Sequence, residues 1–438
     1  MRECDAKAVA IVGADALVKA AGVAVAAEAR RLLGGYYGKR ICVVAGPGLN
    51  GADGRVAAMW LRGRGAKVDL IAVNEQPRVL SGFDLVIDAA FGLGCSRPYD
   101  APSVTPGTLV LAVDLPSGVD ADTGAVLGHP LAADVTLALG ALKYAHIDGD
   151  ATALVGELRY AELGIEAPSD DALIVDADLQ DFVLHGRDDH KWTHAVSVLA
   201  GSARMPGAAD FVCAGALSTG ASMVRLQSRG KIAKLVHLPP EVVRFTGPLV
   251  DPRSRSVVAG PGLGLESSKW LRERLTGIAM SAVLDADALA SETVELSRGQ
   301  EWVLTPHHKE FERLSGTSLG SRCIGAVRAL AVTTGCVILL KGPTTIISSP
   351  QGNLRIVRSG TSNLATAGTG DVLAGMIGAA LARGHQPLSA AALSAHVHGL
   401  AGRRLGAYGV ATDLPDAVSD VLRVHSRRPA VVRSAVEQ

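Results

Sequence analysis

The sequence of 438 residues has few aromatic side chains and no net charge. Phe, Trp and Tyr make up 4% of the chain, and 43 Lys and Arg residues balance 43 Asp and Glu residues. Because a nucleic-acid-binding protein usually carries an excess of basic residues, we expect no nucleic-acid partner. Because large rings are scarce, the core has to be built from Ala, Val, Leu and Ile, and its shape depends on close backbone packing.

Long apolar runs and metal-binding cysteine motifs are also missing. No segment reaches the roughly 18 apolar residues typical of a membrane-spanning helix, and the first residues carry charges without an apolar signal block. The six cysteines are scattered, and none stands in a CxxC or Cys/His zinc spacing. We therefore expect a cytoplasmic protein with reduced, buried thiols and no membrane partner.

What the sequence does contain is a regular alternation of short apolar runs and Ala-rich stretches. The runs are rich in β-branched residues and do not alternate with polar ones, as is typical of parallel strands buried on both faces. We predict strands at Ile41–Ala45, Val68–Val73, Leu85–Asp88, Leu109–Asp114, Ala195–Ala200, Val257–Ala259, Val283–Asp285 and Val337–Lys341. We predict helices at Ala52–Arg64, Gly207–Thr219, Ser267–Thr276, Gly325–Thr333, Asp371–Ala382 and Ala390–Leu405. This order predicts an α/β fold with helices on both faces of its sheets.

A polar, turn-prone segment, Pro168–Asp171, divides the chain. We place the domain boundaries there, with a first domain at residues 1–166 and a second at residues 172–438. Each domain has a GPG tripeptide after a predicted strand, at Gly46–Gly48 and Gly260–Gly262. The two loops indicate that each domain uses a glycine-rich turn after a strand to bind phosphate. They do not indicate an internal repeat.

The second domain has its strongest local signal where a glycine turn leads directly into an apolar helix. At such a helix start, the backbone N–H groups of Gly368, Thr369 and Gly370 would face an anion, which the helix dipole also favours. Asp371 stands on the first turn, where it is either a helix-capping carboxylate or a base. As a base beside an anion pocket, it would deprotonate a hydroxyl that then attacks a phosphoryl group.

Other polar residues of the second domain follow predicted strands. Ligands of open α/β sheets bind at the carboxyl ends of the strands, so a Lys with Thr hydroxyls there suits nucleotide phosphates. The segment that fits is Lys341, Gly342, Pro343, Thr344 and Thr345, which alone also fits a hairpin turn with a surface Lys. Four more residues would converge on the same edge or act as caps and turn formers: Asp285, Asp287, His307 and Glu310.

Six motifs in order give these residues a context. They are AGSARMPGAA (200–209), AGPGLG (259–264), VLDADAL (283–289), LTPHHKEF (304–311), LLKGPTT (339–345) and ATAGTGDVLAG (365–375). The series resembles the ribokinase-like family and, within it, the nucleotide-dependent NAD(P)H-hydrate dehydratases, over Lys191–Asp413. The resemblance implies ADP or ATP with Mg²⁺, and a nucleotide site at Lys341–Thr345 with Gly368, Thr369 and Gly370. It implies that Ala208, Gly262, His307 and the base Asp371 contact the hydrate.

Three strand ends carry the signals of the first domain. The strand Ile41–Ala45 leads into a glycine-rich loop with Asn50. Two later strands end at Asp88 and at Asp114, and Ser117 follows the second of them. Asn50, Asp88 and Ser117 are hard oxygen ligands of the kind an alkali-metal ion prefers, and Asp114 suits proton transfer. Asx turns, caps and a Pro-containing turn are the structural alternatives.

Together these segments, with Lys143, resemble the NAD(P)H-hydrate epimerase domain over Leu17–Ile165, which implies a Rossmann-like parallel sheet. The resemblance implies potassium at Asn50, Asp88 and Ser117. It implies substrate contacts at Asn50, Gly51, Ala52, Asp53, Gly92, Leu93, Gly94, Cys95, Ser96, Arg97, Pro98 and Asp114. Leu49 stands where the family usually has the first of two Asn residues, so we expect weakened epimerisation.

The fusion of both domains resembles the bifunctional NAD(P)H-hydrate repair enzymes. It implies that the first domain interconverts the R and S hydrates of NADH and NADPH, and that the second dehydrates the S form with the help of a nucleotide. The expected partners are these small molecules and further copies of the chain in a homo-oligomer. The alternatives are a kinase of a small alcohol, of the hydroxymethylpyrimidine or hydroxyethylthiazole type, with a non-catalytic first domain, or a scaffold protein whose first domain is an idle interaction module.

Overall fold

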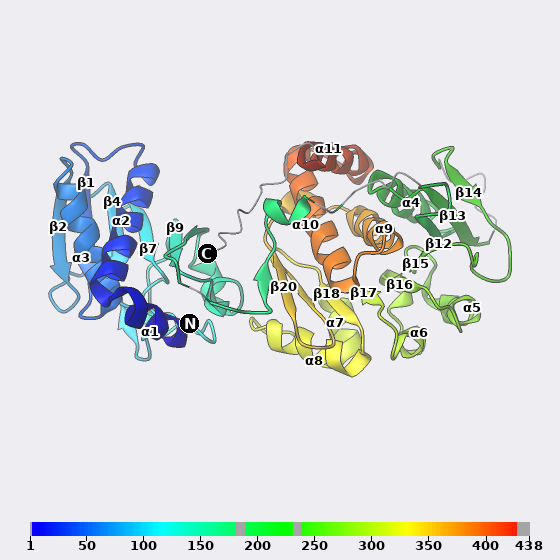
Figure 1. The fold of residues 1–438 in the computed structure, drawn as a ribbon, viewed down its shortest axis with the longest axis horizontal. Helices are drawn as coiled ribbons and strands as arrows, with labels where there is room; N and C mark the ends of the chain where they lie inside the picture. Colours follow the sequence, from blue (N-terminus) through cyan, green and yellow to red (C-terminus); the bar gives the residue numbers. More distant parts are fainter. Residues whose placement is uncertain (1, 166, 181, 183–188, 231–237, 427–438) are drawn as a thin grey trace. The chain divides into compact units, whose positions relative to one another are not determined.

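The structure is a computed structural model that describes residues 2–165, 167–180, 182, 189–230 and 238–426. The chain divides into two compact units (Figure 1). The first comprises Met1–Ser169 with Gly320–Cys323, and the second comprises Asp170–Leu319 with Ile324–Gln438. Each unit has its own sheet and its own apolar core.

A six-stranded parallel sheet forms the centre of the first unit, in the order β10-β9-β7-β4-β1-β2. The strands are β1 (Arg40–Ala45), β2 (Lys67–Ala72), β4 (Leu85–Ala89), β7 (Leu109–Val113), β9 (Val135–Leu139) and β10 (Glu157–Ala161). Helices α2 (Ala14–Leu32) and α3 (Leu49–Arg62) bury small apolar residues against it. The unit also contains helix α1 (Arg2–Val12) and the 3₁₀ turns η1 (Tyr144–His146) and η2 (Asp150–Ala153). Two short strand pairs lie outside the main sheet: β3 (Val79–Leu80) with β6 (Ser103–Val104), and β5 (Tyr99–Asp100) with β8 (Gly128–His129). The parallel sheet expected for this domain is confirmed.

The second unit has a ten-stranded sheet in the order β11-β20-β19-β18-β17-β16-β15-β12-β13-β14. Its strands are β11 (Ala172–Leu173), β12 (Ala195–Ser202), β13 (Met223–Arg229), β14 (Val242–Arg244), β15 (Ser256–Ala259), β16 (Ser281–Leu284), β17 (Val303–Leu304), β18 (Val337–Leu340), β19 (Thr345–Ser348) and β20 (Leu354–Val357). The predicted strands of this sheet pair in parallel, but the sheet is mixed at one end, where β19, which was not predicted, runs antiparallel to both β18 and β20. The four residues between β18 and β19 are too few for the crossover of a dozen or so residues that parallel strands require.

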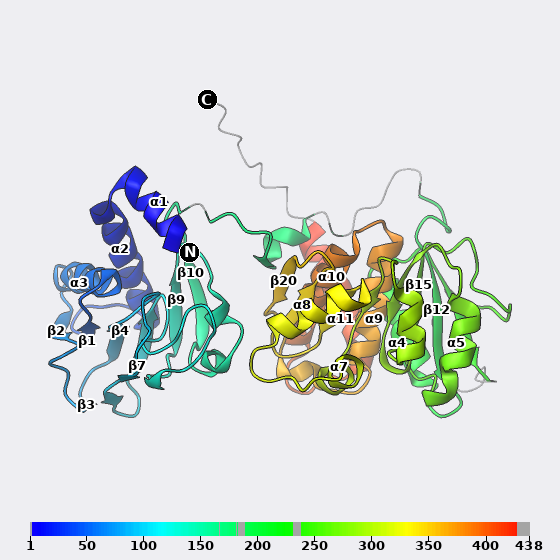
Figure 2. The ribbon, with the colours of Figure 1, turned by 90° about the horizontal axis from the view of Figure 1, so that it is seen from below.

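Helices cover both faces of this sheet, as Figures 1 and 2 show. One large apolar core joins the sheet to α4 (Gly207–Ser218), α9 (Thr369–Ala382), α10 (Pro387–Leu405) and α11 (Leu414–Ser426). The remaining helices are α5 (Ser268–Leu275), α6 (Ser291–Val294), α7 (His308–Ser315) and α8 (Ile324–Thr334). Short 3₁₀ turns are η3 (Asp176–Leu179), η4 (Leu265–Ser267), η5 (Ala286–Ala288), η6 (Glu295–Ser297), η7 (Ser362–Leu364) and η8 (Ala411–Asp413). The predicted α/β fold is confirmed in both units.

Helices α4 and α9 touch backbone to backbone, which fixes the position of α9. A Cβ atom on Gly215 of α4 would lie 2.2 Å from the carbonyl oxygen of Val372, and one on Gly375 of α9 would lie 2.1 Å from that of Val212. Neither position has room for a side chain. The glycines therefore set how closely the helix that begins at Thr369 approaches its neighbour.

We expect Gly215→Ala to destabilise the second unit by about 1–3 kcal/mol, the usual cost of overpacking a core. The added methyl group has to push α9 away, because its nearest neighbour is backbone and not a movable side chain. Gly207→Ala is the matched control on the same helix, since a Cβ there meets nothing within 4 Å. Urea unfolding followed by circular dichroism measures both variants. Equal midpoints would contradict the tight contact.

Cysteines and apolar helices can be compared with the sequence expectations directly. All six cysteines are free, and Cys42, Cys95, Cys213 and Cys336 are buried. Cys4 and Cys323 are partly exposed, so the expectation of buried thiols is wrong for these two.

In the described part of the chain, no single helix is long and apolar enough to cross a membrane. The bent pair Ala6–Val12 and Ala14–Leu32 meets that test only when its two helices are taken together.

Candidate functional sites

The first candidate site lies where α9 begins in the second unit. Gly368 precedes the helix with a φ of 96°, and a Cβ there would lie 2.4 Å from the ring of Phe211. Only glycine adopts this conformation without strain, so the turn has to be glycine here. The first backbone N–H groups of a helix have no partner inside it, which leaves the amides around Gly370 available to an anion. The predicted glycine turn and helix start are therefore present, and the binding of an anion there stays a prediction.

Asp371 stands on the first turn of α9 among other charged groups. Burial raises the pKa of this carboxyl to about 7, and the charges of Asp285, Asp287 and Glu310 add to the rise, while Lys341 lowers it. These effects place all five residues in one electrostatic neighbourhood. A carboxyl with a pKa near neutrality exchanges a proton readily, which is what a general base requires.

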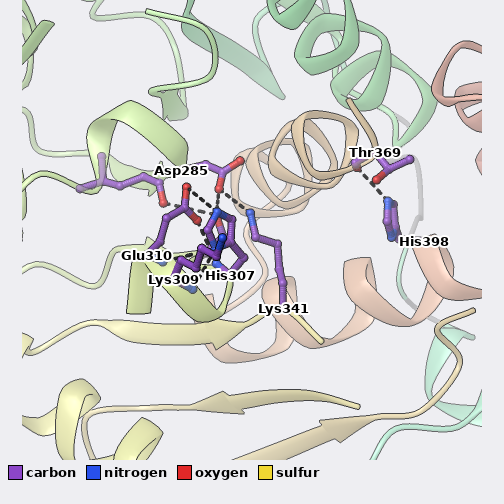
Figure 3. A network of polar contacts seen from close by, with 9 residues as sticks. Asp285, His307, Lys309, Glu310, Lys341, Thr369 and His398 are labelled. Carbon is purple, nitrogen blue, oxygen red and sulfur yellow. Dashed lines mark hydrogen bonds and ion pairs between the residues drawn. The ribbon is translucent and has the colours of Figure 1, made fainter. Parts of the chain in front are cut away.

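Lys341 connects this carboxylate cluster to the start of α9 (Figure 3). Its Nζ donates to Asp285 Oδ1 at 2.8 Å, and a Cβ on Gly370 would lie 3.5 Å from the same Nζ. Asp285 is 2% exposed and also accepts from Thr305 Oγ1 at 2.8 Å. Burial lowers the pKa of Lys341, but the charges of Asp285, Glu310 and Asp371 outweigh it, and the pKa lies above its ordinary value. The ammonium therefore stays charged beside the anion-binding turn.

The segment predicted to bind nucleotide forms the turn between β18 and β19. The hairpin alternative describes the backbone correctly, because Leu340 pairs with Ile346 in antiparallel register. Its other half, a surface Lys, is wrong, since Lys341 is ion-paired to Asp285. Pro343 is exposed, and its carbonyl oxygen would lie 3.3 Å from a Cβ on Gly360. The sheet thus brings the loop after β20 against this turn.

His307 forms the N-cap of α7, one strand away from Lys341. Residues His307 and Lys341 form a parallel bridge, and Lys341 N donates to Pro306 O at 2.9 Å. The His307 Nδ1 accepts from the backbone N–H of Lys309 at 3.1 Å and of Glu310 at 3.3 Å. Glu310 Oε2 in turn accepts from His307 N at 2.9 Å, which completes a capping box.

Two further predicted residues meet each other at the loop after β15. Gly262 has a φ of 67°, and a Cβ there would lie 2.6 Å from the Cβ of Ala208. Asp287 Oδ2 accepts from the N–H of Gly264 at 2.8 Å, which ties this loop to the residues after β16. Ala208 and Gly262 are thus neighbours, and Asp287 links their loop to the charges around Asp371.

Sequence reasoning missed His398, which lies buried on α10. Its Nε2 donates to the carbonyl oxygen of Thr369 in the first turn of α9 at 2.9 Å. Burial lowers the pKa of His398 to about 4, so the ring is neutral near neutral pH. The available signal was a histidine in the Ala-rich part of a predicted helix, because a polar group that becomes buried there needs a hydrogen-bond partner.

The second candidate site lies at the carboxyl ends of β1, β4 and β7 in the first unit. A Cβ on Gly46 would lie 1.8 Å from Ala90 O, and one on Gly51 would lie 1.9 Å from Gly46 O, so the loop after β1 closes tightly onto its neighbour. The side chain of Asn50 lies beside Gly92, where a Cβ would be 3.3 Å from Asn50 Cγ. Leu49 is 60% exposed. The loops after β1 and β4 therefore meet at this edge of the sheet.

Asp88 and Ser117 bond to each other at this edge. Ser117 Oγ donates to Asp88 Oδ1 at 2.6 Å and Ser117 N donates to Oδ2 at 2.8 Å. Burial raises the pKa of Asp88, against the lowering effect of these hydrogen bonds. No cationic side chain of the described residues contacts this carboxylate, and the Nδ2 atom of Asn50 is buried without a hydrogen-bond partner among them. A buried carboxylate without a cation fits a bound alkali ion.

Asp114 pairs with Lys143 directly after β7. Lys143 Nζ donates to Asp114 Oδ1, and Leu139 N donates to the same oxygen at 3.0 Å. His146 Nε2 contacts Asp114 O at 2.6 Å. Asp114 has a φ of 65°, a left-handed conformation that Asp tolerates better than most residues. Several contacts thus hold one carboxylate in an unusual backbone position, a pattern that occurs at functional sites.

Asp53 lies close enough to Asp114 for the two side chains to interact electrostatically. It is 7% exposed on the first turns of α3, where burial, and then the charge of Asp114, raises its pKa to about 8. In the loop after β4, Cys95 is 6% exposed and its N–H donates to Gly92 O at 3.0 Å, while Ser96 and Arg97 are exposed. The structure thus gathers Asp53, Asp114 and Lys143 at this edge of the sheet.

Comparison with known proteins relates this arrangement to a family. Residues 196–423 match the family described as NAD(P)H-hydrate dehydratase, and residues 14–82 and 76–145 match the one described as YjeF-related protein N-terminus. The bifunctional NAD(P)H-hydrate repair enzyme of Mycobacterium leprae is 35% identical to this chain, over 96% of this chain and 95% of that one. The chain belongs to the family of bifunctional NAD(P)H-hydrate repair enzymes.

Other relatives support the same family assignment. The bifunctional NAD(P)H-hydrate repair enzyme of Gloeobacter violaceus is 33% identical, over 90% of this chain and 89% of that one. The ADP/ATP-dependent NAD(P)H-hydrate dehydratase of Bacillus subtilis, co-crystallized with ATP/Mg²⁺, is 25% identical with a TM-score of 0.51, over 57% of this chain and 97% of that one. A ribokinase-like superfamily protein of Enterococcus faecalis, 20% identical with a TM-score of 0.53 over 60% of this chain and 99% of that one, shares the fold. The predicted ribokinase-like fold is confirmed.

Proposed function

We propose that this protein repairs hydrated NADH and NADPH in two steps. The second domain dehydrates the S hydrate with the help of a nucleotide, and the first interconverts the R and S forms so that both drain through the dehydratase. The observation that carries the proposal is Asp371, whose carboxyl with a pKa of about 7 stands at a helix start beside the Lys341 ammonium. Relatives matched over both domains support the two-step activity.

The dehydratase chemistry begins at the hydroxyl on C6 of the hydrated ring. Asp371 takes its proton, and the oxygen attacks the terminal phosphoryl group of the nucleotide. The backbone N–H groups at Gly368–Gly370 and the Lys341 ammonium stabilise the charge that develops. The C6–O bond then breaks with loss of a proton from C5, which restores the dihydronicotinamide, because phosphate is a far better leaving group than hydroxide. His307, Gly262 and Ala208 contact the hydrate, and Lys341–Thr345 with Thr369 and Gly370 contact the nucleotide.

The charge balance around Asp371 fits a nucleotide that arrives with its cation. Asp371 interacts with three other carboxylates and with one ammonium. Mg²⁺ on the nucleotide phosphates would neutralise charge that this acidic neighbourhood would otherwise repel. The ATP/Mg²⁺ with which the Bacillus subtilis relative was co-crystallized supports this cofactor pair, and we propose ADP as the phosphoryl donor.

The epimerase chemistry relies on the Asp114 side chain, which Lys143 and the Leu139 N–H hold in place. We propose that it takes the proton of the C6 hydroxyl as the C6–N1 bond opens to a C6 carbonyl and N1 gains a proton. N1 then adds to the other face of that carbonyl and the protons return, which inverts C6. The loops at Asn50–Asp53 and Gly92–Pro98 would contain the substrate. A potassium ion, which Asn50, Asp88 and Ser117 would hold, supplies positive charge for the substrate phosphate.

One observation, the Asp114–Lys143 pair, favours this proposal over both alternatives. A kinase of a small alcohol would share Asp371 and the anion-binding turn, but it has no use for the buried Asp114–Lys143 pair of the first domain. The same pair argues against an idle interaction module, because a buried ion pair in a strained backbone position serves no docking surface. A cytoplasmic location and a homo-oligomeric state are part of the proposal.

The test is recovery of the dihydronicotinamide absorbance from an equilibrated mixture of R and S NADH hydrate. ADP, Mg²⁺ and K⁺ are present, and the run is short compared with spontaneous epimerisation. We expect full recovery, which requires both domains. Recovery that stops at the S fraction would leave only the dehydratase. No recovery with ADP or ATP, together with a stable phosphorylated small alcohol, would establish the kinase instead.

The pH dependence of dehydration should report the base. Asp371 is active as a carboxylate, and its pKa of about 7 means that the active fraction grows as the pH rises through neutrality. We expect kcat/KM for the S hydrate to fall about tenfold for each pH unit below that pKa, since this ratio reports the free enzyme. Initial rates at saturating nucleotide measure the profile. A flat profile across neutral pH would contradict the assigned base.

Leu49→Asn should raise the rate of epimerisation. The residue is 60% exposed beside the substrate loop, so the change costs little stability and adds one polar contact. One hydrogen bond contributes about 0.5–1.5 kcal/mol, or about 2- to 12-fold. The R-to-S rate is measured with excess dehydratase. Met59→Asn, at a 67% exposed position on the same helix, is the control, and an equal effect of both changes would contradict a specific role for position 49.

A further inference from the structure

Strands β7 and β9 of the first unit end in the same kind of turn. Around Asp114, Leu115 N donates to Val113 O at 2.8 Å, and the turn around Gly140 has the equivalent bond, also of 2.8 Å. The φ angles of these two central residues are 65° and 71°. A hydrogen bond across three residues with a positive φ in the middle is the rarer, strained form of the γ-turn. Glycine adopts it without strain, so the Asp at position 114 introduces strain that a glycine would avoid.

Contacts around Asp114 hold it in this conformation. Its Oδ1 accepts from Leu139 N at 3.0 Å and from Lys143 Nζ, and its N–H donates to Leu137 O at 2.9 Å. None of these bonds involves the carbonyl oxygen of Asp114, whose direction depends on the ψ angle of that residue. This oxygen accepts from His146 Nε2 at 2.6 Å. The bond from His146 therefore fixes the half of the strained turn that the other contacts leave unfixed.

The ring of His146 also contacts the backbone of Lys143, the other member of the ion pair. Its Nδ1 accepts from Lys143 N at 3.0 Å. A backbone N–H can only donate and a carbonyl oxygen can only accept, so Nδ1 presents its lone pair and Nε2 carries the proton. His146 is 1% exposed, which keeps bulk water away from both bonds. One neutral tautomer thus joins the backbones of two residues that lie 29 positions apart.

We propose that His146 is the positioning residue of the first site, because its bond to the Asp114 carbonyl holds the strained turn that directs the Asp114 carboxyl toward Lys143. The proposal rests on the proton transfer that the proposed function assigns to Asp114. Both ring nitrogens of His146 are engaged by backbone groups, so the proton transfer itself belongs to Asp114. Losing the bond from Nε2 would let the turn relax and move the carboxyl away from its partner.

Two variants separate the two bonds of the ring. In His146→Asn, the side-chain oxygen can take the place of Nδ1 and accept from Lys143 N, but the side chain is too short to reach Asp114 O. In His146→Gln, the side-chain NH₂ can take the place of Nε2 and donate to that oxygen. We expect crystal structures to show a negative φ at Asp114 in the Asn variant and the native turn in the Gln variant. A native turn in the Asn variant, or a folded Gln variant without the turn, would overturn the proposal.

This structural result does not depend on whether the chain acts on hydrated NADH, and the kinetics of epimerisation provide the second test. The R-to-S rate is measured with excess dehydratase. We expect kcat of the Asn variant to fall about tenfold or more with KM little changed, since a misplaced catalytic group slows the reaction without removing substrate contacts. The Gln variant should recover most of this rate. A loss confined to KM would make His146 a substrate-binding residue and overturn the positioning role.

A relaxed turn with an unchanged kcat would have a different meaning. It would show that Asp114 is not the proton-transfer group, so the assignment in the proposed function would be wrong and the catalytic role of His146 with it. A native turn in the Asn variant leaves that assignment intact and overturns only the role of His146. The two failures are therefore distinguished by the φ angle at Asp114.

Thr136→Val is the matched control for a simple loss of stability. Thr136 is also buried in the first unit, on β9, and its Oγ1 donates to the carbonyl oxygen of Val155 at 2.7 Å. Both this variant and His146→Asn lose a buried bond from a side chain to a carbonyl, which thermal unfolding measures. We expect only His146→Asn to lose epimerisation, while both variants keep dehydration of the S hydrate, which reports a folded second unit. Equal losses of epimerisation would make His146 an ordinary core residue and overturn the proposal.

Discussion

Replacing Asp371 by Asn is expected to reduce nucleotide-dependent dehydration by about 10³- to 10⁴-fold, the upper part of the range for a general base. The amide cannot take the proton of the C6 hydroxyl, although it fills the same space on the first turn of α9. The fold should persist, because the carboxyl is surrounded by other negative charges whose repulsion the substitution relieves. ADP binding should change little, since the anion-binding amides and Lys341 are untouched.

The control for this experiment is Asp416→Asn. Asp416 also stands in the first turn of a helix, α11, but it is exposed on the surface. The pair of variants therefore distinguishes a base from a carboxylate that only stabilises a helix start. Dehydration is followed by the recovered dihydronicotinamide absorbance, and ADP binding by calorimetry. Near-normal turnover of Asp371→Asn would show that the assigned base is wrong.

Asp114→Asn should abolish epimerisation while the dehydratase of the same chain continues to work. Asn tolerates the left-handed backbone at this position, so the main chain can keep its conformation. Lys143, whose side chain is 4% exposed, loses its partner, and breaking a buried pair in this way costs about 3–5 kcal/mol of stability. Repair of a mixed R and S sample should therefore stop at the S fraction.

A double variant separates the two effects of Asp114→Asn. In Asp114→Asn with Lys143→Met, no buried ammonium is left unpaired, so most of the lost stability should return. Epimerisation should not return, because the proton-transfer group is still missing. Thermal unfolding measures the first effect, and the rate of R-to-S conversion measures the second. Epimerisation restored together with stability would mean that Asp114 acts only as a counter-ion.

Much of the fold is predictable because it depends on local pattern. The strand predicted at Ile41–Ala45 is β1, Arg40–Ala45, and the helix predicted at Gly207–Thr219 is α4, Gly207–Ser218. A run of β-branched residues identifies a buried strand but not its direction. The antiparallel β19 was missed for that reason, since its direction is decided by the short turn before it.

The residues of the candidate sites also fall into two groups: those that local sequence predicts, and those that depend on contacts between distant residues. Asp371, Lys341 and Asp114 stand at strand ends and helix starts, where sequence position alone indicates a ligand-facing edge. The protonation of Asp53 and the bond from His398 to Thr369 arise from residues distant in sequence, so no local pattern contains them. Sequence position predicts that Asp285 and Lys341 share one edge of the sheet. It does not predict their ion pair, which spans β17 between the ends of β16 and β18.

That pairing of Lys341 with Asp285 also bears on how a spent nucleotide leaves. An ammonium without any other counter-ion would bind a departing phosphate strongly, because the departure would leave its charge unpaired. Here Asp285 Oδ1 lies 2.8 Å from Lys341 Nζ and can replace the phosphate as the counter-ion. Under the proposed function, the nucleotide phosphate therefore has to compete with Asp285 for the ammonium, and its departure leaves no buried cation unpaired.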